Sequence, residues 1–419
     1  MKEPDAVIRK VRSAMSRRLS VKLALPMVLC SVAVVSASAA ANASSTKKMA
    51  GSARNAITLS TLPMSVQQYY KGYQYFTKLL PDPYSSWIPP SPPWKFCEND
   101  SYLGNTWRAQ SLAEYKKLVA EYQKAGLAKG GLTVTNSDNN VELQLSQLNT
   151  LVNEGCNVIF SIPGSPTALC SGIAHAFARH VLFISDESPV YCKDAINVTF
   201  NDYWDASIGT KAVLKAIGYK GNVLIELGIP GLSDTVAETK AIMNAIYGHP
   251  GVHVLGEVNG QWTPSIAKTA TLEFLSTHPQ KVDAIIDEGQ EDVTPEQALQ
   301  QSGRPLAIES SFSGECPAMA LWKQHPNIIK VAVNQGGGPA AYEAFYVAAR
   351  MLMGQKPLVN TLMYPLPEIT KANFSKWYKP SMTLQSTCYP SPPGGRAVAD
   401  SYFNALFQGG RPLKVSPLP

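Results

Sequence analysis

Short apolar strands alternate with helical segments from Trp94 onward, and this alternation restricts the chain to an α/β fold. Runs of about four to eight residues rich in Val, Ile and Phe are typical of buried strands, and helical segments of about 10–15 residues separate them. This pattern predicts βαβ units and parallel sheets. We expect strands at residues 94–97, 132–135, 158–161, 181–185, 196–200, 223–226, 252–258, 284–287, 306–309 and 328–333.

The number of these units predicts two lobes rather than one sheet. Roughly ten βα units exceed one doubly wound sheet, and a chain of 419 residues is long enough for two domains. Helices are expected at residues 107–125, 141–154, 167–179, 205–217, 234–247, 264–277, 295–301 and 339–353.

Both ends of the regular region carry additions. Residues 44–93 are rich in Tyr and Pro, which disfavours regular structure, so we expect an N-terminal extension that packs along the surface of the globular part and is not core. A recognition stalk is the alternative. The segment after Pro367 is irregular and Pro-rich, with one short helix near residues 398–407. We interpret it as a C-terminal wrap.

The first 43 residues have the pattern of a secretory signal peptide. A basic stretch is followed by an uncharged apolar run at residues 23–35 and by small residues of the A-x-A type. The apolar run is shorter than the ~20 residues that span a membrane, which disfavours the alternative of an uncleaved anchor. Met15 is an alternative start, because the signal is complete from there. The sequence therefore predicts export to the periplasm.

The signal peptide also explains the positive charge of the chain. Seven of the 37 basic and two of the 31 acidic residues lie in residues 1–43, so the remainder has 30 basic and 29 acidic residues and a net charge of +1. A remainder without a basic stripe does not predict a nucleic-acid partner.

Six cysteines follow the signal peptide, in a compartment that permits disulfides. Fifteen pairings exist for six cysteines, so the sequence alone does not select one. We expect at least one disulfide and favour Cys170–Cys192 and Cys316–Cys388. Cys97 and Cys156 lie in or beside strands, and we interpret them as buried thiols.

Residues 97–108 (CENDSYLGNTWR) connect the first strand to the first helix. Asn105 is a good helix N-cap, and a helix start at the carboxyl end of a parallel sheet suits a polar ligand. Tyr102 and Trp107 offer flat faces for a sugar ring. The alternative is that Trp107 anchors the helix in the core.

Polar residues recur at the other expected strand ends. They include Asp186 and Glu187, Ser233, Trp262, Gln290, Ser310 and Asn334. Hydroxyl, amide and carboxylate groups pair with hydroxyl groups, and Trp stacks on C–H faces. This composition indicates recognition of a neutral or weakly cationic polyhydroxyl compound.

The sequence lacks the common motifs for nucleotide binding, serine hydrolysis and zinc binding. The sequence contains no G-x-G-x-x-G, no G-x-x-x-x-G-K-[ST], no G-x-S-x-G and no H-x-x-x-H, so we predict neither a metal nor a cofactor. Asp186 and Glu187 are an acid/base pair in the enzyme interpretation. Adjacent strand residues point to opposite faces, however, and we therefore expect no catalysis.

Six segments, taken in this order, resemble the type I periplasmic binding proteins of ABC importers, in the ribose/galactose class. The resemblance covers roughly residues 94–366. The segments are SYLGNTWR, SDNNVELQLSQLNTLVNEGCNVIFSIPGS, VLFISDES, NVLIELGIPGLSD, GQWTPSIAKTATLEFLSTHPQKVDAIIDEG and IKVAVNQGGGPAAYEAFYVAARMLMGQKP.

The resemblance implies two Rossmann-like lobes joined by a three-strand hinge, with the ligand cleft between them. Crossings would fall near residues 200–201, 334–335 and 364–365. Lobe 1 would hold residues 94–200 and 335–364. Lobe 2 would hold residues 201–334 and 365–419, including the C-terminal wrap.

The resemblance also assigns site residues. Asn105 and Trp107 match the family's first loop, Asp186 its strand-ending aspartate, and Trp262 its stacking aromatic. Asn334 matches the amide at the second crossing. An arginine common in sugar binders is replaced by Glu187, and Gln290 and Ser310 stand near positions where the family has acidic or amide groups. The cleft is therefore expected to be acidic, which keeps a polyol, an amino sugar or another cationic solute open.

The implied function is a periplasmic solute receptor that delivers its ligand to ABC permease subunits and acts as a monomer. A sensory receptor of the same fold and a secreted α/β enzyme are the alternatives. For the enzyme, the sequence offers no nucleophile–base arrangement.

Overall fold

The computed structural model describes residues 57–289, 293–393 and 396–409. The predicted signal peptide, the first residues of the extension and Gln290 lie outside the described residues. Within the described part, two six-stranded sheets form the cores of two α/β lobes, as the sequence predicted.

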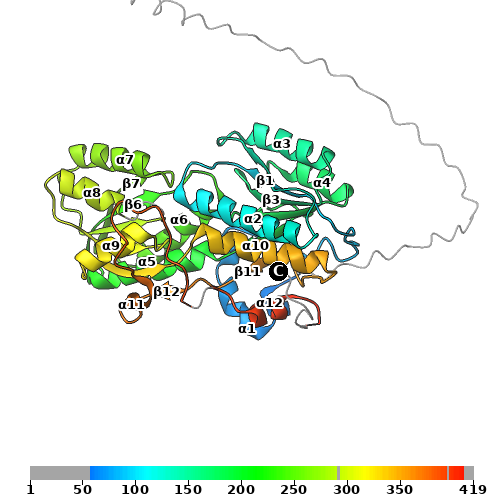
Figure 1. Ribbon diagram of the computed structural model, residues 1–419. Coiled ribbons are helices and arrows are strands. Elements are labelled where there is room, and N and C mark those ends of the chain that lie inside the picture. Colours follow the sequence, from blue (N-terminus) through cyan, green and yellow to red (C-terminus); the bar gives the residue numbers. More distant parts are fainter. Residues whose placement is uncertain (1–56, 290–292, 394–395, 410–419) are drawn as a thin grey trace, which may run out of the picture. The chain divides into compact units, whose positions relative to one another are not determined.

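The first sheet, in lobe 1, has the order β11-β5-β4-β3-β1-β2, and all its neighbouring strands are parallel. Its strands are β1 (Phe96–Asp100), β2 (Thr133–Asn136), β3 (Val158–Ile162), β4 (Leu182–Asp186), β5 (Ile196–Thr199) and β11 (Thr361–Met363). Helices cover both faces (Figure 1). They are α2 (Thr106–Lys124) and α10 (Gly337–Leu352) on one face, and α3 (Val141–Asn153) and α4 (Cys170–Ala178) on the other.

The second sheet, in lobe 2, has the order β12-β10-β9-β8-β6-β7, and only the β10–β12 pair is antiparallel among these strands. Its strands are β6 (Gly221–Leu227), β7 (Val252–Asn259), β8 (Ala284–Asp287), β9 (Ile308–Ser311), β10 (Ile329–Val333) and β12 (Glu368–Ile369). Its helices are α5 (Asp202–Ala216), α6 (Ser233–Ile246), α7 (Pro264–Thr277), α8 (Thr294–Gln301), α9 (Cys316–Gln324) and α11 (Phe374–Trp377). Helices α9 and α11 and strands β11 and β12 were not predicted.

Alternating apolar side chains explain the layers. In β1, Phe96 packs with α2 and α10, while its neighbour Cys97 packs toward α3 and α4. In β6, Leu224 and Ile225 divide in the same way between two clusters of lobe 2. Strand neighbours point to opposite faces, so a strand covered on both sides needs apolar residues on both, as at the start of β1 and the middle of β6.

The chain passes between the sheets three times, after β5, after β10 and after β11. These crossings lie where the resemblance placed the three-strand hinge. At the first crossing the side chain of Asn201 accepts a hydrogen bond of 3.0 Å from the Trp204 N–H and so starts α5. The cap fixes where the chain leaves lobe 1 and enters lobe 2.

The N-terminal extension is part of the core of lobe 1, so the prediction of a surface segment was wrong for its described residues. Val66, Tyr70, Phe76 and Tyr84 are fully buried there. The Tyr70 hydroxyl donates to the carbonyl of Thr361 (2.9 Å) and accepts from the N–H of Met363. Tyr therefore supplies both apolar burial and the hydrogen bonds that the outer strand β11 needs.

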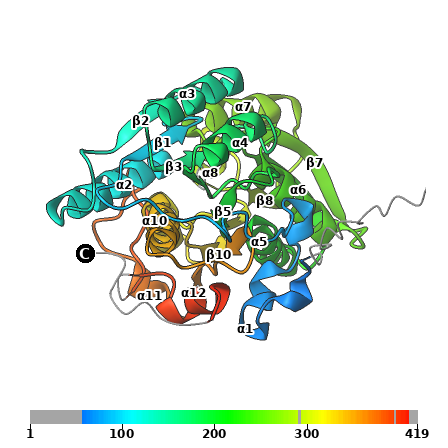
Figure 2. The same cartoon turned by 90° about the vertical axis from the view of Figure 1, so that its right-hand side faces the viewer.

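The C-terminal wrap belongs to both lobes rather than to lobe 2 alone. Residues near α11 pack in lobe 2, whereas Val398, Phe403 and Leu406 enter the main cluster of lobe 1. Helix α12 (Asp400–Leu406) lies beside α1 (Met64–Gln67) of the extension (Figure 1 and Figure 2). The sequence predicted a short helix near residues 398–407, but not that it packs in lobe 1. Three short 3-10 helices, Leu59–Thr61, Gln68–Tyr70 and Tyr73–Tyr75, complete the extension.

Three disulfides are formed. Cys170–Cys192 and Cys316–Cys388 confirm the favoured pairs. Cys97 and Cys156 also form a disulfide, so their interpretation as free buried thiols was wrong. The strand start of β3 lies next to β1, which brings the two cysteines to a Cα–Cα distance of 6.0 Å, within the usual range for a bridge.

Candidate functional site

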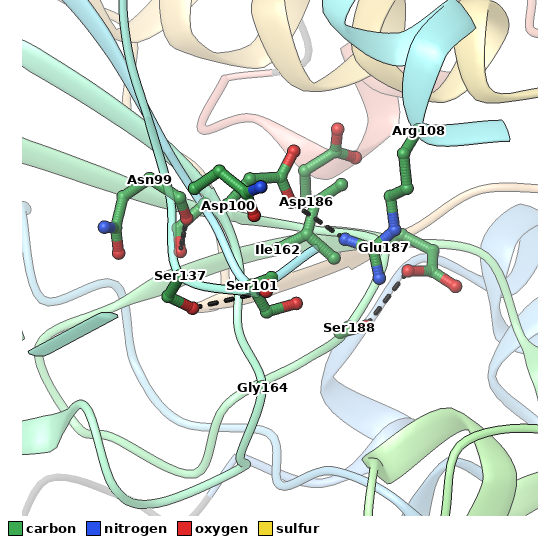
Figure 3. Close-up of polar contacts among 12 residues, drawn as sticks. Asn99, Asp100, Ser101, Arg108, Ser137, Ile162, Gly164, Asp186, Glu187 and Ser188 are labelled. Carbon is green, nitrogen blue, oxygen red and sulfur yellow. Dashed lines mark hydrogen bonds and ion pairs between the residues drawn. The ribbon is translucent and has the colours of Figure 1, made fainter. Parts of the chain in front are cut away.

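The carboxyl ends of β1 and β4 meet the first turn of α2. Asn105 caps this helix by accepting a hydrogen bond of 2.9 Å from the Arg108 N–H, as the sequence predicted. The cap directs the first turn, and with it Arg108, toward the sheet. Figure 3 shows the Arg108 side chain extending from α2 to Asp100, Asp186 and Glu187.

Arg108 is the cation at the centre of this acidic cluster. It is 2% exposed, and its Nη1 donates to Oδ1 of the fully buried Asp100 at 3.0 Å. Asp186 ends β4 and accepts a hydrogen bond of 2.6 Å from the Tyr115 hydroxyl. Glu98 lies two residues before Asp100 on the same strand, so both face α2.

Burial raises the pKa values of these carboxyl groups. It raises the pKa of Asp186 to about 7, against the hydrogen bond from Tyr115. It raises the pKa of Asp100 to about 6, although the charge of Arg108 lowers it. The pKa of Glu98 is well above its usual value, first through burial and then through the charge of Asp100. At neutral pH the cluster therefore contains protonated as well as ionised carboxyl groups.

Lobe 2 contributes its own acids to the same place. Asp234, in the first turn of α6, accepts a hydrogen bond from the Ser188 hydroxyl of lobe 1. The same hydroxyl lies 3.0 Å from Oε2 of Glu187. The Ser188 hydroxyl has one proton and donates to one carboxyl group at a time. A proton on Glu187 or Asp234 therefore lets both carboxyl groups hydrogen-bond with Ser188. Burial raises the pKa of Asp234 to about 6 and that of Glu187 well above its usual value.

A second set of contacts joins the lobes at the start of α2. The Asn105 side-chain amide donates to the carbonyl of Trp262 at 3.4 Å. The hydroxyl groups of Tyr102 and Thr263 are 3.5 Å apart. These residues come from the loop before α2 in lobe 1 and the loop before α7 in lobe 2. The facing strand ends of both lobes therefore meet through polar groups.

Two of the contacting loops hold strained residues. Glu187 has a φ of +62° and Trp262 a φ of +50°, in the left-handed region that favours glycine. A non-glycine residue costs on the order of 1–3 kcal/mol there, and such residues cluster at ligand sites. The turn at Trp262 places its ring against Gly228, where an added Cβ would lie 2.2 Å from the ring.

A cavity of about 300 Å³ lies beside these contacts. It is lined by the start of α2, by the first turns of α7, α8 and α9, and by residues 384–387 and 389 of the C-terminal wrap. Most of the lining side chains are neutral hydrogen-bonding groups, among them Asn105, Thr106, Thr294, Gln297, Gln385 and Thr387.

The remaining predicted site residues lie in different surroundings. Trp107 packs with Ile162, Ala340 and Tyr389, and its ring N–H donates to the carbonyl of Gln335, which favours the core-anchor alternative. Ser310 faces α5 at Gly209. The Asn334 side-chain amide donates to the carbonyl of Pro390 at 3.2 Å. The Ser233 hydroxyl donates to Oδ1 of Asp234 at 3.4 Å. Gln290 falls outside the described residues.

Sequence reasoning missed Arg108, Asp100, Asp234 and the contribution of the wrap. Arg108 follows the cap Asn105 by three residues, which is the only local signal for its position. Asp100 lies beyond the strand predicted at residues 94–97, but it ends β1. Among the described ranges, no group of three or more His, Cys, Asp or Glu side chains is arranged to hold a metal ion. In the same part of the chain, no helix has the length and apolar character needed to cross a membrane.

Comparisons with known proteins agree with this fold. The family model described as a periplasmic binding protein domain matches residues 101–356. A xylitol-binding protein of Mycolicibacterium smegmatis is 24% identical over 264 residues, which are 62% of this chain and 74% of the relative.

Solved structures share the fold. An ABC transporter solute binding protein from Thermobispora bispora has a TM-score of 0.64 and 24% identity, over 69% of this chain and 90% of that one. A solute binding protein from Mycobacterium smegmatis with bound glycerol has a TM-score of 0.62 and 17% identity, over 70% and 100% of the two chains. Two α/β lobes, three crossings and a family match over more than half of the sequence lead to one assignment: the chain belongs to the periplasmic binding protein family, with the type I fold.

Proposed function

We propose that this protein is the substrate-binding component of an ABC importer and that it holds one small polyhydroxyl solute between its lobes. The family consists of binding proteins, one relative is a xylitol-binding protein, and one structure of the same fold holds bound glycerol. The solute would be a sugar, a polyol or a related compound. Export by residues 1–43, a periplasmic location and a monomeric state are parts of the same proposal, and N-terminal sequencing of the exported protein tests the first of them.

The observation that carries the proposal is the pairing of polar groups across the lobes. Ser188 of lobe 1 donates to Asp234 of lobe 2, and Asn105 donates to the carbonyl of Trp262. Each lobe alone offers half of a hydrogen-bonding surface. A solute that touches both halves favours the closed form by its differential affinity for that form.

Individual residues receive roles in this proposal. Asp186 and Glu187 accept hydrogen bonds from solute hydroxyl groups, and Asn105 and Tyr102 orient the solute at the start of α2. Trp262 forms an apolar wall from lobe 2. Protonated carboxyl groups in the cluster donate as well as accept, which suits a neutral polyol, since every hydroxyl group does both.

A thermal-shift screen of the chain from residue 44 onward tests the function. The panel contains pentitols, inositols, aldoses, amino sugars and diamines. A true ligand at 100 times its Kd stabilises the folded protein by about 2.7 kcal/mol. Stabilisation by a sugar or polyol supports the proposal. If no sugar, polyol or amino sugar raises the Tm and an unrelated solute does, the proposed substrate class is wrong.

A further inference from the structure

The C-terminal wrap forms one wall of the cavity between the lobes. Leu384, Gln385, Ser386, Thr387 and Tyr389 all line this space of about 300 Å³. Asn105 lines it from lobe 1, and the first turns of α7, α8 and α9 line it from lobe 2. The volume lies at the lower end of ligand pockets, which range over about 300–1,000 Å³ and suit small molecules.

We propose that residues 384–389 are a specificity-determining wall of the binding site and contact the bound solute directly. This inference rests on the proposed function, because it assigns further contacts to the same interlobe site. The family match ends at residue 356, so the wrap lies beyond the matched region.

The wrap is held in place on both sides of this wall. The Cys316–Cys388 disulfide ties it to the start of α9, and the Cys316 N–H donates to the Cys388 carbonyl at 2.8 Å. Tyr389 packs beside Trp107 of lobe 1, and Asn334 at the second crossing donates to the Pro390 carbonyl. The segment is therefore attached to lobe 2, lobe 1 and the hinge within three residues.

The wall is also ordered within itself. The Thr383 N–H donates to the Ser386 hydroxyl oxygen at 2.9 Å, and the Ser386 N–H donates to the Thr383 carbonyl at 3.1 Å. Met382, just before this turn, is buried in lobe 2. A turn closed in this way presents the side chains of Gln385 and Thr387 without a large entropy cost on binding.

The chemistry of the cavity matches an uncharged polyhydroxyl ligand. Glu315 is the only ionisable acid or base, apart from the Tyr389 phenol, among the described residues that line it. An amide such as that of Gln385 and a hydroxyl such as that of Thr387 each donate and accept. Hydroxyl groups of a polyol have the same dual character. The wall thus adds hydrogen bonds to a solute that Asn105 contacts from lobe 1.

The first experiment removes the proposed hydrogen bonds from Gln385 and Thr387 to the solute and leaves the backbone of the wall unchanged. Gln385→Ala and Thr387→Ala are made singly and together, and titration calorimetry uses xylitol, myo-inositol and glycerol as probes. Each substitution should weaken the tightest of these probes by about three- to tenfold, as expected for a neutral hydrogen bond. Ser381→Ala is the matched control, since Ser381 is exposed on the same segment outside the cavity.

The second experiment releases the anchor. The double variant Cys316→Ser and Cys388→Ser should weaken the same probe by roughly tenfold, because the wall is no longer preorganised. The double variant Cys170→Ser and Cys192→Ser removes a disulfide within lobe 1 and should leave the Kd unchanged. If the first double variant does not fold, the Gln385 and Thr387 variants, which keep every disulfide, decide.

The outcomes separate the two proposals. In one outcome, the wild type binds a probe and the Gln385→Ala, Thr387→Ala double variant binds it with the same affinity. This result overturns the role of the wall and leaves the proposed function intact. A wild-type protein that binds none of the three probes and no other sugar or polyol contradicts both proposals.

Discussion

The hydroxyl of Ser188 in lobe 1 donates a hydrogen bond to the carboxyl group of Asp234 in lobe 2, and both side chains are buried. Because Glu187 contacts the same hydroxyl, two carboxyl groups and one serine share the available protons. If the lobes separated, water would solvate Glu187 and Asp234, and both carboxyl groups would ionise. The shared proton is therefore kept only while the lobes are in contact. Lobe closure and protonation are therefore linked at this point.

Removal of Arg108 should destabilise the protein. Arg108→Met leaves Asp100 buried without its partner, and loss of one member of a buried ion pair costs about 3–5 kcal/mol. Urea unfolding at pH 7 measures the effect. The loss should be smaller at pH 5, because Asp100, with a pKa raised to about 6, is then protonated. An unchanged unfolding free energy at pH 7 contradicts the pairing, and the Arg108→Met, Asp100→Asn double variant should recover part of the loss.

The stability of the protein should fall as the pH rises from 5 to 8. Burial raises the pKa of Asp100 and Asp234 to about 6, of Asp186 to about 7 and of Glu288 to about 8. The folded state therefore holds protons that the unfolded chain, with carboxyl pKa values near 4, has lost. The contribution of these carboxyl groups to the free energy of unfolding is fully present below about pH 4 and is lost as the pH rises through about 6–8. Thermal unfolding across this range measures the slope.

The matched variant for the pH dependence is Asp186→Asn. An amide does not titrate, so this variant should have a shallower decline between pH 6 and 8 than the wild type. A stability that rises over this range would contradict the assignment of buried, protonated acids.

Loss of the Tyr70 hydroxyl should weaken the attachment of the N-terminal extension. Tyr70→Phe leaves the carbonyl of Thr361 and the N–H of Met363 without the group that bonds both. An unsatisfied buried polar group costs about 1–3 kcal/mol. Chemical denaturation measures this, with Tyr73→Phe, from a half-buried ring of the same segment, as the control. Equal stability of both variants would show that the bonds to β11 contribute nothing.

The exported protein should contain no free thiol among its six cysteines. All six are paired in three disulfides, including the unexpected Cys97–Cys156. Alkylation under denaturing conditions without reductant should therefore add no mass. Two added groups would mean that one bridge does not form. Loss of the Cys97–Cys156 bridge, which closes 59 residues, should cost about 2–5 kcal/mol.

Local patterns predicted the elements well because these elements depend on nearby residues. The alternation after Trp94 predicted the two lobes, and Asn105 predicted the start of α2 with its actual capping bond. Asp186 was correctly placed at the end of a strand. Each conclusion needs only strand periodicity, capping chemistry or the order of elements.

Features that depend on distant packing were not predicted. Asp100 has low strand propensity, yet the pairing of β1 with β2 on one side and β3 on the other keeps it in β1. The direction of Arg108 depends on how α2 is rotated against the sheet. The partner of Cys97 depends on strand order, and Trp107 finds an apolar cluster made by α10 and the wrap. No local pattern encodes these long-range contacts.

The most direct test of the account is calorimetry of one solute against variants from each lobe. Glu187→Gln changes lobe 1 and Asp234→Asn changes lobe 2, each with almost the same shape as the original side chain. Asp283→Asn is the control, because Asp283 is half-buried just before β8, at the end of that strand opposite to the site. The account predicts one sugar or polyol molecule per wild-type chain and at least tenfold weaker binding in both cleft variants, with wild-type affinity in the control. Tight, stoichiometric binding that both cleft variants retain would contradict a site between the lobes.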